Sequence, residues 1–236
     1  CSSIICCSEF LRGILVQHHR VPPNKAVTVL NAYHGPRSED VAETRVEAQQ
    51  KLGLEPSRRY VLTNCRLMNW KRVDGKNRPL ALREENDVEL LVAGDGDMEL
   101  PWKALAAELG VSERVRFLGN VPHQEIPLYI RASDVFVLNS EYEGLSHTLL
   151  EVQALGTPMI ASGVCGNPEV VEHEVNGLLV DPDRPEELAE SLRRVLGDPE
   201  MGQRFVEAGH ERSAAFDRDT TFSRVEAILR EAAGGS

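Results

Sequence analysis

From about residue 59 onward, short apolar runs alternate with stretches that have the periodicity of helices. Several of the apolar runs are apolar throughout, as a parallel strand with both faces buried requires. The predicted strands are Tyr60–Thr63, Val88–Ala93, Val115–Leu118, Val135–Leu138, Pro158–Ala161 and Leu178–Val180. The predicted helices are Met98–Leu109, His123–Ala132, Thr148–Ala154 and Pro185–Leu196. This alternation predicts an α/β fold built on a doubly wound parallel sheet.

The two ends of the chain differ from this pattern. Ile4–Cys7 and Val27–Leu30 are predicted strands joined by a helix from Ser8 through Gln17. Such a lone β-α-β unit cannot cover both faces of its strands, so we expect it to be the last piece of a preceding domain. Residues 200–233 predict two helices with a break near Asp217. Within the alternating region, Val73–Asp87 predicts only a short or irregular helix, because glycine, proline and polar residues interrupt it.

Composition excludes several classes of function. The net charge of −11 argues against nonspecific binding of nucleic acid, and 5% aromatic residues leave little for stacking on bases. No apolar run approaches the length of a transmembrane helix, and the N-terminal residues lack the basic region of a signal peptide. The five cysteines lack the paired spacing of a zinc site, so we expect free buried thiols. A cytoplasmic location follows, with contact at most to the cytoplasmic face of a membrane.

The most specific segment is Asn139–Glu151, which follows a predicted strand and begins a predicted helix. Gly144 permits close approach of the backbone to a ligand, and the amides of Leu145–Leu149 point out of the helix N-terminus. These amides and the helix dipole form an anion-binding site. Glu151 can accept hydrogen bonds from two sugar hydroxyls. Taken alone, Glu143 and Glu151 could equally be two surface carboxylates of an amphipathic helix rather than ligand-binding residues.

A pair of cations follows the strand Tyr60–Thr63, where Arg66 and Lys71 lie beyond its carboxyl end. Ligands of a doubly wound sheet bind at this end of the strands. An arginine fork and a lysine point charge can clamp a diphosphate there. Either cation alone is more often a solvated surface charge, but a helix N-terminus in the same sheet makes a phosphate site the better interpretation.

Seven segments then occur in a telling order: R-L-x-x-x-K, A-G-D-G, V-R-F-L-G-N-V, E-G-L-S-x-T-L-L-E, G-T-P-x-I-A-S, G-N-P-E-V-V and N-G-L-L-V. In this order and spacing, from Arg59 to Leu196, the chain resembles the retaining family 4 glycosyltransferases. The resemblance implies a GT-B fold, in which two Rossmann-like domains face each other across a cleft. Residues 37–214 would be the donor-binding domain, 1–36 a remnant of the acceptor domain with its linker, and 215–236 the C-terminal crossover helix.

The resemblance also assigns roles to residues. Arg66 and Lys71 match the pair on the donor diphosphate, and Glu143 matches the first glutamate of the E-x7-E motif, near the transferred sugar; these three are the predicted catalytic residues. Glu151 matches the second glutamate, on the nucleotide ribose. The loop at the phosphates and sugar would be Gly144, Leu145, Ser146, His147, Thr148 and Leu149. The loop whose backbone contacts the base would be Gly119, Asn120 and Val121.

Several positions depart from the family pattern. Cys65 and Arg72 stand where the family has glycines, and they add bulk where its backbone approaches the phosphates. His147 stands where asparagine is common. Asp95-Gly96-Asp97 reads as the metal-binding D-x-D of another glycosyltransferase class, but it lies in the strand-to-helix turn of the A-G-D-G segment, where small residues are expected. The resemblance implies neither a metal nor a cofactor.

The leading hypothesis is the donor-binding half of a retaining glycosyltransferase. Its substrate would be a UDP- or GDP-sugar, its acceptor a glycan or a lipid-linked molecule, and its partner an acceptor domain outside this chain. A second hypothesis is a module that binds nucleotide-sugar without turning it over. A sugar-nucleotide 2-epimerase shares the GT-B fold but lacks this combination of R-x4-K and E-G-L-S. No G-x-S-x-G motif supports hydrolase chemistry.

Overall fold

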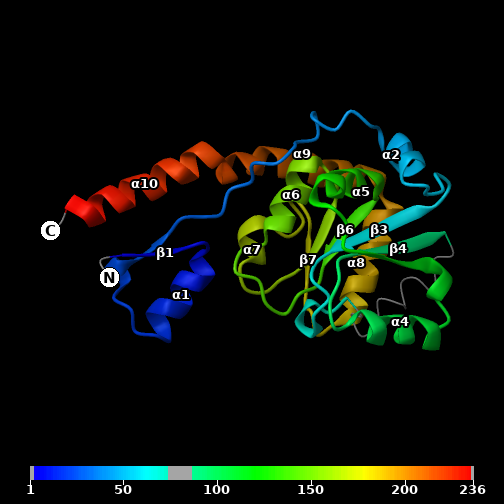
Figure 1. Ribbon diagram of the computed structural model, residues 1–236, viewed down its shortest axis with the longest axis horizontal. Helices are drawn as coiled ribbons and strands as arrows, with labels where there is room; N and C mark the ends of the chain where they lie inside the picture. The colour runs from blue at the N-terminus through cyan, green and yellow to red at the C-terminus, as the bar shows by residue number, and fades with distance from the viewer. Residues whose placement is uncertain (1–2, 74–86, 235–236) are drawn as a thin grey trace.

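The computed structural model describes residues 3–73 and 87–234, and its largest element is a six-stranded parallel sheet (Figure 1). The strands are β3 (Arg59–Asn64), β4 (Val88–Ala93), β5 (Val115–Gly119), β6 (Val135–Leu138), β7 (Met159–Ser162) and β8 (Leu178–Val180). Each observed end lies within about one residue of its predicted position. The predicted doubly wound α/β fold is therefore confirmed.

The order of the strands reverses next to β3. The sheet runs β5-β4-β3-β6-β7-β8, so the chain builds outward from β3 to β5 and then crosses back to build outward from β6 to β8. Open α/β sheets bind their ligands at the carboxyl ends of the strands, at this kind of switch point. The segments that follow Asn64 and Leu138 therefore begin at the place where a ligand is expected.

Side chains of each strand alternate between two buried cores, one on each face of the sheet. Leu62 and Phe136 belong to the core that α5 (Ile126–Ala132) and α6 (His147–Leu155) cover. Val61 and Val137 belong to the core that α4 (Glu99–Glu108) and α8 (Pro185–Gly197) cover. Because both faces are buried, the strands must be apolar at successive positions, as the sequence shows. Single 3₁₀ turns lie at Pro23–Lys25, Asn69–Lys71, Ser112–Arg114, His123–Glu125 and Ala214–Phe216.

Two helices of this domain are not predicted from the sequence, α2 (Arg45–Lys51) and α7 (Asn167–Val170). The start of α2 has a capping box: the Glu47 amide donates to Thr44 Oγ1 at 3.3 Å, and the Thr44 amide donates to Glu47 Oε2 at 2.8 Å. The sequence T-R-V-E therefore indicates the start of a helix. It lies before residue 59, where the alternation of apolar runs and helical stretches begins. The expected irregular helix at Val73–Asp87 falls on residues 74–86, which lie outside the described residues.

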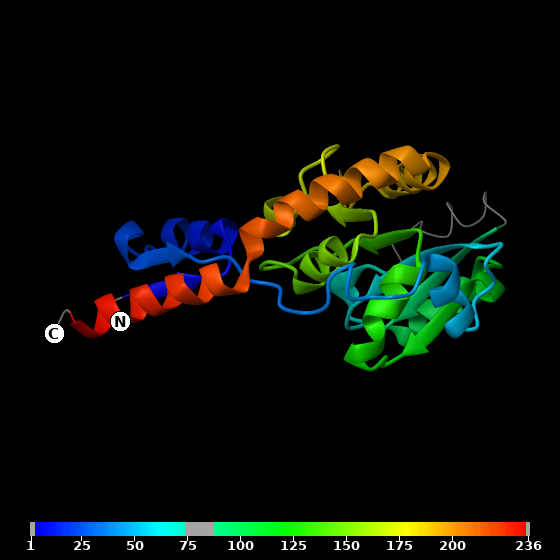
Figure 2. The same cartoon turned by 90° about the horizontal axis from the view of Figure 1, so that it is seen from above.

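The N-terminal residues form a small unit of their own. As predicted, β1 (Ile4–Cys6) pairs in parallel with β2 (Ala26–Thr28), and α1 (Glu9–Gln17) connects them. The helices α9 (Pro199–Ser213) and α10 (Arg218–Gly234) meet at the predicted break, and α10 runs back beside this unit (Figures 1 and 2). The division of the chain at residues 36 and 214 stays a prediction.

The chain crosses between the unit and the domain twice, and the two crossings touch. The Tyr33 amide of the linker donates to the Phe216 carbonyl at 3.2 Å, and Tyr33 also forms a β-bridge with Asp217. On α10, Thr221 Oγ1 lies 3.4 Å from the Leu30 carbonyl oxygen, to which it donates. The linker and the start of the last helix are therefore one connected structure.

The turn after β4 packs against the backbone of the loop after β3. Gly94 has φ +120°, which side chains rarely allow, and a Cβ at this position would lie 1.9 Å from the Cys65 carbonyl oxygen. The Leu67 amide donates to the Asp95 carbonyl at 2.7 Å. The turn therefore fixes the backbone from which Arg66 projects, and this is the structural reason for the A-G-D-G segment.

We predict that Gly94→Ala lowers the free energy of unfolding by about 3 kcal/mol or more, because the methyl group overlaps a carbonyl oxygen that the fold holds in place. Gly110→Ala is the matched control: Gly110 has φ +69°, but nothing lies within 4 Å of its Cβ position. The control should lose only about 1–2 kcal/mol, from backbone strain alone. Chemical denaturation measures both, and equal losses would show that the close approach does not constrain the turn.

Candidate functional site

An ion pair between Lys71 and Glu143 joins the loops that follow β3 and β6. Lys71 ends the 3₁₀ turn Asn69–Lys71, and its Nζ lies 2.5 Å from Glu143 Oε1. The two side chains are 18% and 14% exposed, so solvent screens their attraction less than it screens a surface pair. The structure thus brings together two of the residues predicted to be catalytic. The third, Arg66, is exposed on the same loop as Lys71.

Backbone contacts hold the Glu143 loop in place. The Glu141 amide donates to the Trp70 carbonyl at 2.7 Å, and the Gly166 amide donates to the Glu143 carbonyl at 3.0 Å. A Cβ on Gly166 would lie 1.9 Å from the Gly144 carbonyl oxygen, so the loop after β7 packs tightly here as well. Glu143 is therefore fixed by the loops on both sides of its own.

The helix α6 begins at His147, one residue before its predicted start, and Ser146 is its N-cap. Ser146 Oγ accepts a hydrogen bond from the Leu149 amide at 3.3 Å. The next amides inward from the cap, those of His147 and Thr148, belong to the first turn, which has no intrahelical acceptors. His147 is exposed and Thr148 half-buried, whereas the neighbouring predicted residues are buried: Leu145, Ser146 and Leu149. The turn thus has first-turn amides of the kind that bind anions, and the predicted anion site stays a prediction.

Glu151 lies one turn into α6 and is only 6% exposed. Its Oε1 is buried and has no hydrogen-bond partner among the described residues. Burial raises the pKa of the Glu151 carboxyl above its ordinary value, and His123 opposes this shift in part. The pKa of the Tyr33 phenol is also raised, by burial and by the negative charge of Glu151. A buried, unpartnered carboxylate oxygen costs free energy that a ligand hydroxyl would recover.

The residues predicted to lie near the base follow β5. Gly119 ends that strand with φ +67°, and its carbonyl accepts a hydrogen bond from the Gly94 amide at 2.8 Å. Asn120 is exposed, and Val121 packs against the core under α5 and α6. Since β5 is the edge strand, two strands away from β3, these residues lie on the β4 side of the Lys71 loop.

The N-terminal unit lies directly on the Glu143 loop, a placement that the sequence does not predict. The ring of Phe10 meets that of Tyr142 edge to face, with centroids 6.2 Å apart. A Cβ on Gly144 would lie 3.2 Å from Leu11 Cδ1. The linker joins in, because Asn31 Nδ2 donates to the carbonyl of the loop residue Leu145 at 3.4 Å. The unit and the linker are therefore part of the site.

A carboxylate from α7, next to the large sheet, caps the helix of this unit. Glu169 of α7 accepts hydrogen bonds from the Glu9 amide at 2.8 Å and the Phe10 amide at 3.0 Å, the first two amides of α1. A negative charge at a helix N-terminus is favourable. Glu169 belongs to the G-N-P-E-V-V segment identified in the sequence. Its contact with the first amides of α1 could not be predicted from that segment.

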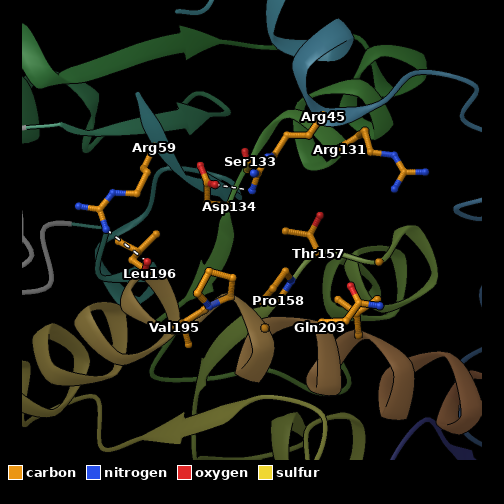
Figure 3. Close-up of a pocket in the computed structure, with 14 residues that line it drawn as sticks. Arg45, Arg59, Arg131, Ser133, Asp134, Thr157, Pro158, Val195, Leu196 and Gln203 are labelled. Carbon is orange, nitrogen blue, oxygen red and sulfur yellow. Dashed lines mark hydrogen bonds and ion pairs between the residues drawn. The ribbon is translucent and has the colours of Figure 1, made fainter. Parts of the chain in front are cut away.

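A cavity of about 570 Å³ lies at the opposite, amino-terminal ends of the strands. Figure 3 shows that Arg45 reaches Asp134 across it, that Arg59 reaches the Leu196 carbonyl, and that Arg131 points away. The Arg45–Asp134 ion pair is 2.5 Å long. The charges around this cavity are thus engaged with the protein itself, and none of the predicted site residues lines it.

Other sequence expectations concern cysteines, metals and membranes. Cys6, Cys7, Cys65 and Cys165 form no disulfide bond, and of these four only Cys6 is fully buried, while Cys1 lies outside the described residues. Within residues 3–73 and 87–234, no three His, Cys, Asp or Glu side chains gather where they could hold a metal ion. None of the helices in this same part of the chain has the length and apolar character to cross a bilayer.

Comparison with known proteins identifies the family. The model of the family described as glycosyl transferases group 1 matches residues 44–212, which include every element from β3 to α8. The chain belongs to this glycosyltransferase family. The predicted resemblance is therefore confirmed, while the roles that it gives to single residues stay predictions.

Among glycosyltransferase relatives, an uncharacterised one from Methanocaldococcus jannaschii is 30% identical over 199 residues, covering 83% of this chain and 51% of its own. A D-inositol 3-phosphate glycosyltransferase from Thermobispora bispora is 32% identical over 234 residues, covering 92% of this chain and 53% of its own. The chain thus spans about half the length of these curated relatives. The crystal structure of Anabaena HepE in complex with UDP and glucose has the same fold, with a TM-score of 0.85, 23% identity, and coverage of 97% of this chain and 62% of that one.

We predict that Glu151→Gln stabilises the folded protein at neutral pH. Without ligand at neutral pH, the variant should be more stable by about 1 kcal/mol, since burial penalises the charged carboxylate. Because burial raises the pKa of Glu151 in the folded protein, this advantage should shrink as pH falls through the raised pKa and vanish below the ordinary value for glutamate. Thermal unfolding between pH 4 and pH 8 measures it. An advantage that does not change with pH would contradict the assignment of a strained, buried charge.

We predict that Glu169→Ala loosens the N-terminal unit, because two amides of α1 lose their acceptors. The loss of about 1 kcal/mol should speed hydrogen exchange of the Phe10 amide roughly fivefold. Glu172→Ala is the control: Glu172 lies near Glu169 in sequence but pairs with Arg212 at 3.2 Å. Equal exchange in both variants would show that the Glu169 cap does not hold the unit.

Proposed function

We propose that this chain is the nucleotide-sugar-binding part of a glycosyltransferase that transfers a sugar from a UDP- or GDP-sugar to an acceptor hydroxyl. Retention of the anomeric configuration and independence from metal are part of the proposal, and the family resemblance supports both. The observation that carries it is the Lys71–Glu143 pair beside the first turn of α6, at the switch point of the sheet. A cation and helix amides suit a diphosphate, and a carboxylate suits sugar hydroxyls.

In the proposed reaction, the bond between the anomeric carbon and the diphosphate oxygen breaks, and negative charge develops on the diphosphate. Arg66, Lys71 and the first amides of α6 stabilise this charge. Glu143 holds the sugar with its anomeric carbon toward the acceptor. The acceptor hydroxyl attacks from the face that the diphosphate leaves and gives its proton to the departing phosphate, so the configuration is retained.

The Lys71–Glu143 ion pair has a consequence for donor binding. Lys71 and Glu143 neutralise each other in this pair. A diphosphate competes with Glu143 for Lys71, and the sugar hydroxyls replace the bonds that Glu143 gives up. Part of the binding energy therefore separates the ion pair, and Lys71 and Glu143 both bind the donor instead of each other.

The relatives support the class of substrate. The Anabaena structure contains UDP and glucose, and the Thermobispora relative is named a D-inositol 3-phosphate glycosyltransferase. For this chain we propose a glycan or lipid-linked acceptor, bound mainly by a partner domain that precedes the N-terminal unit, and a cytoplasmic location. A second candidate is a module that binds nucleotide-sugar without turnover.

We predict that the chain binds UDP or GDP, and that Lys71→Ala and Glu151→Ala each weaken the binding about tenfold or more, since each removes a charged hydrogen-bonding group. Isothermal calorimetry measures the affinity. Lys51→Ala is the matched control, because Lys51 pairs with Glu43 on the surface at α2. If neither nucleotide binds the wild-type chain, or if Lys71→Ala binds like Lys51→Ala, the site is wrongly assigned.

The two candidate functions differ in turnover. Hydrolysis of UDP- and GDP-sugars by the chain, with and without an added acceptor domain of a relative, separates them. We expect turnover with the added domain and its loss in Glu143→Gln. Tight binding with no turnover under either condition would favour the binding module.

A further inference from the structure

Arg72, next to Lys71 in sequence, connects three loops at the carboxyl ends of the strands. Its guanidinium pairs with Glu141 of the loop after β6. It also donates to the Pro182 carbonyl at 2.7 Å and to Asp183 Oδ1 at 2.7 Å, both in the loop after β8. Arg72 itself follows the 3₁₀ turn Asn69–Lys71 in the loop after β3, so one side chain connects three segments far apart in the sequence.

The backbone of Arg72 has a conformation that favours glycine. Arg72 has φ +44° and ψ +43°, a left-handed conformation that costs an ordinary residue roughly 1 kcal/mol or more. A residue held in this conformation needs compensation from its surroundings. The three side-chain interactions with Glu141, Pro182 and Asp183 provide it. The expectation from sequence, that Arg72 merely adds bulk near the phosphates, therefore omitted what its side chain does.

These interactions surround Lys71. On one side of it, the Trp70 carbonyl accepts a hydrogen bond from the Glu141 amide at 2.7 Å. On the other side, Arg72 pairs with the carboxylate of the same Glu141. The Glu141 residue thus engages both neighbours of Lys71, two residues before the Glu143 carboxylate that Lys71 contacts. The backbone of Lys71 is fixed although its own side chain is long and flexible.

Arg72 also changes the charge around the site. Glu141 and Asp183 would together place two negative charges beside the loop that is proposed to bind a diphosphate. The guanidinium between them leaves a net charge of about −1 for the three groups, which lowers their repulsion of an incoming anion. A glycine at this position would leave both carboxylates uncompensated.

We propose that Arg72 is a positioning residue: by bridging the loops after β3, β6 and β8 and screening Glu141 and Asp183, it sets Lys71 for the distal phosphate of the donor. The inference rests on the proposed function for its role in binding. The bridge itself does not depend on that function, so the two can fail separately.

The test compares nucleotide affinities in Arg72→Gly, Arg72→Lys and a control. Calorimetry gives the dissociation constants of UDP and UMP, and of GDP and GMP. For Arg72→Gly we expect diphosphate binding about tenfold weaker and monophosphate binding within about twofold of wild type, because only the diphosphate reaches Lys71. Arg72→Lys should be intermediate, since an ammonium cannot reproduce the three contacts of the fork.

The control variant is Arg20→Gly. Arg20 also has a left-handed backbone, with φ +55°, but it is exposed in the loop between α1 and β2. It therefore reports the relief of backbone strain without loss of the bridge. If Arg72→Gly leaves the ratio of diphosphate to monophosphate affinity as it is in Arg20→Gly, the proposal is overturned.

Hydrogen exchange tests the bridge even if the wild-type chain binds no nucleotide, a result that would overturn the proposed function alone. The Lys71 amide donates to the Met68 carbonyl at 2.9 Å, and the Glu141 amide donates to Trp70. Both amides should exchange at least about fivefold faster in Arg72→Gly than in Arg20→Gly. Asp183→Asn should speed them in the same direction and by less. Unchanged exchange in Arg72→Gly would overturn the bridge.

Discussion

The reversal of strand order beside β3 places two loops from opposite halves of the sheet next to each other, and those loops carry the charged groups of the candidate site. A parallel sheet places all the loops that follow its strands at one edge, but it gives them no backbone partners there. Here the partners come from neighbouring loops. The Gly94 turn packs against Cys65, and the Gly166 amide bonds to the Glu143 carbonyl. The positions of the charged side chains are therefore fixed by these close contacts between loops.

Two residues of the candidate site are in conformations or surroundings that cost free energy in the folded protein. Glu151 is buried, with one carboxylate oxygen that has no hydrogen-bond partner in the described part of the chain, and Arg72 adopts a left-handed backbone. In a chain with a net charge of −11, the cations Arg66 and Lys71 are concentrated where a diphosphate is expected. A buried charged group without a partner and a strained backbone, close together in an otherwise well-packed fold, are typical of functional sites.

The strands and the neighbourhood of Lys71 and Glu143 could be predicted because both depend on local patterns. An apolar run identifies a buried strand, and residues just after two such strands share one edge of the sheet. The docking of α1 could not be predicted, since its cap Glu169 lies 160 residues along the chain from Glu9. The partners of Arg72 are likewise set by loops that only the folded sheet brings together. The helix α2 could have been found from its capping box.

The paired crossings between the N-terminal unit and the domain determine how the two can move. Because Tyr33 is hydrogen-bonded to Phe216, the chain's outward and return paths lie side by side. Two adjacent chain segments permit the N-terminal unit to rotate about one axis through them, and they resist its translation or twisting relative to the domain. Motion of the unit away from Tyr142 and Gly144 would thus be a one-axis opening, and each return would bring the same residues back onto the same loop.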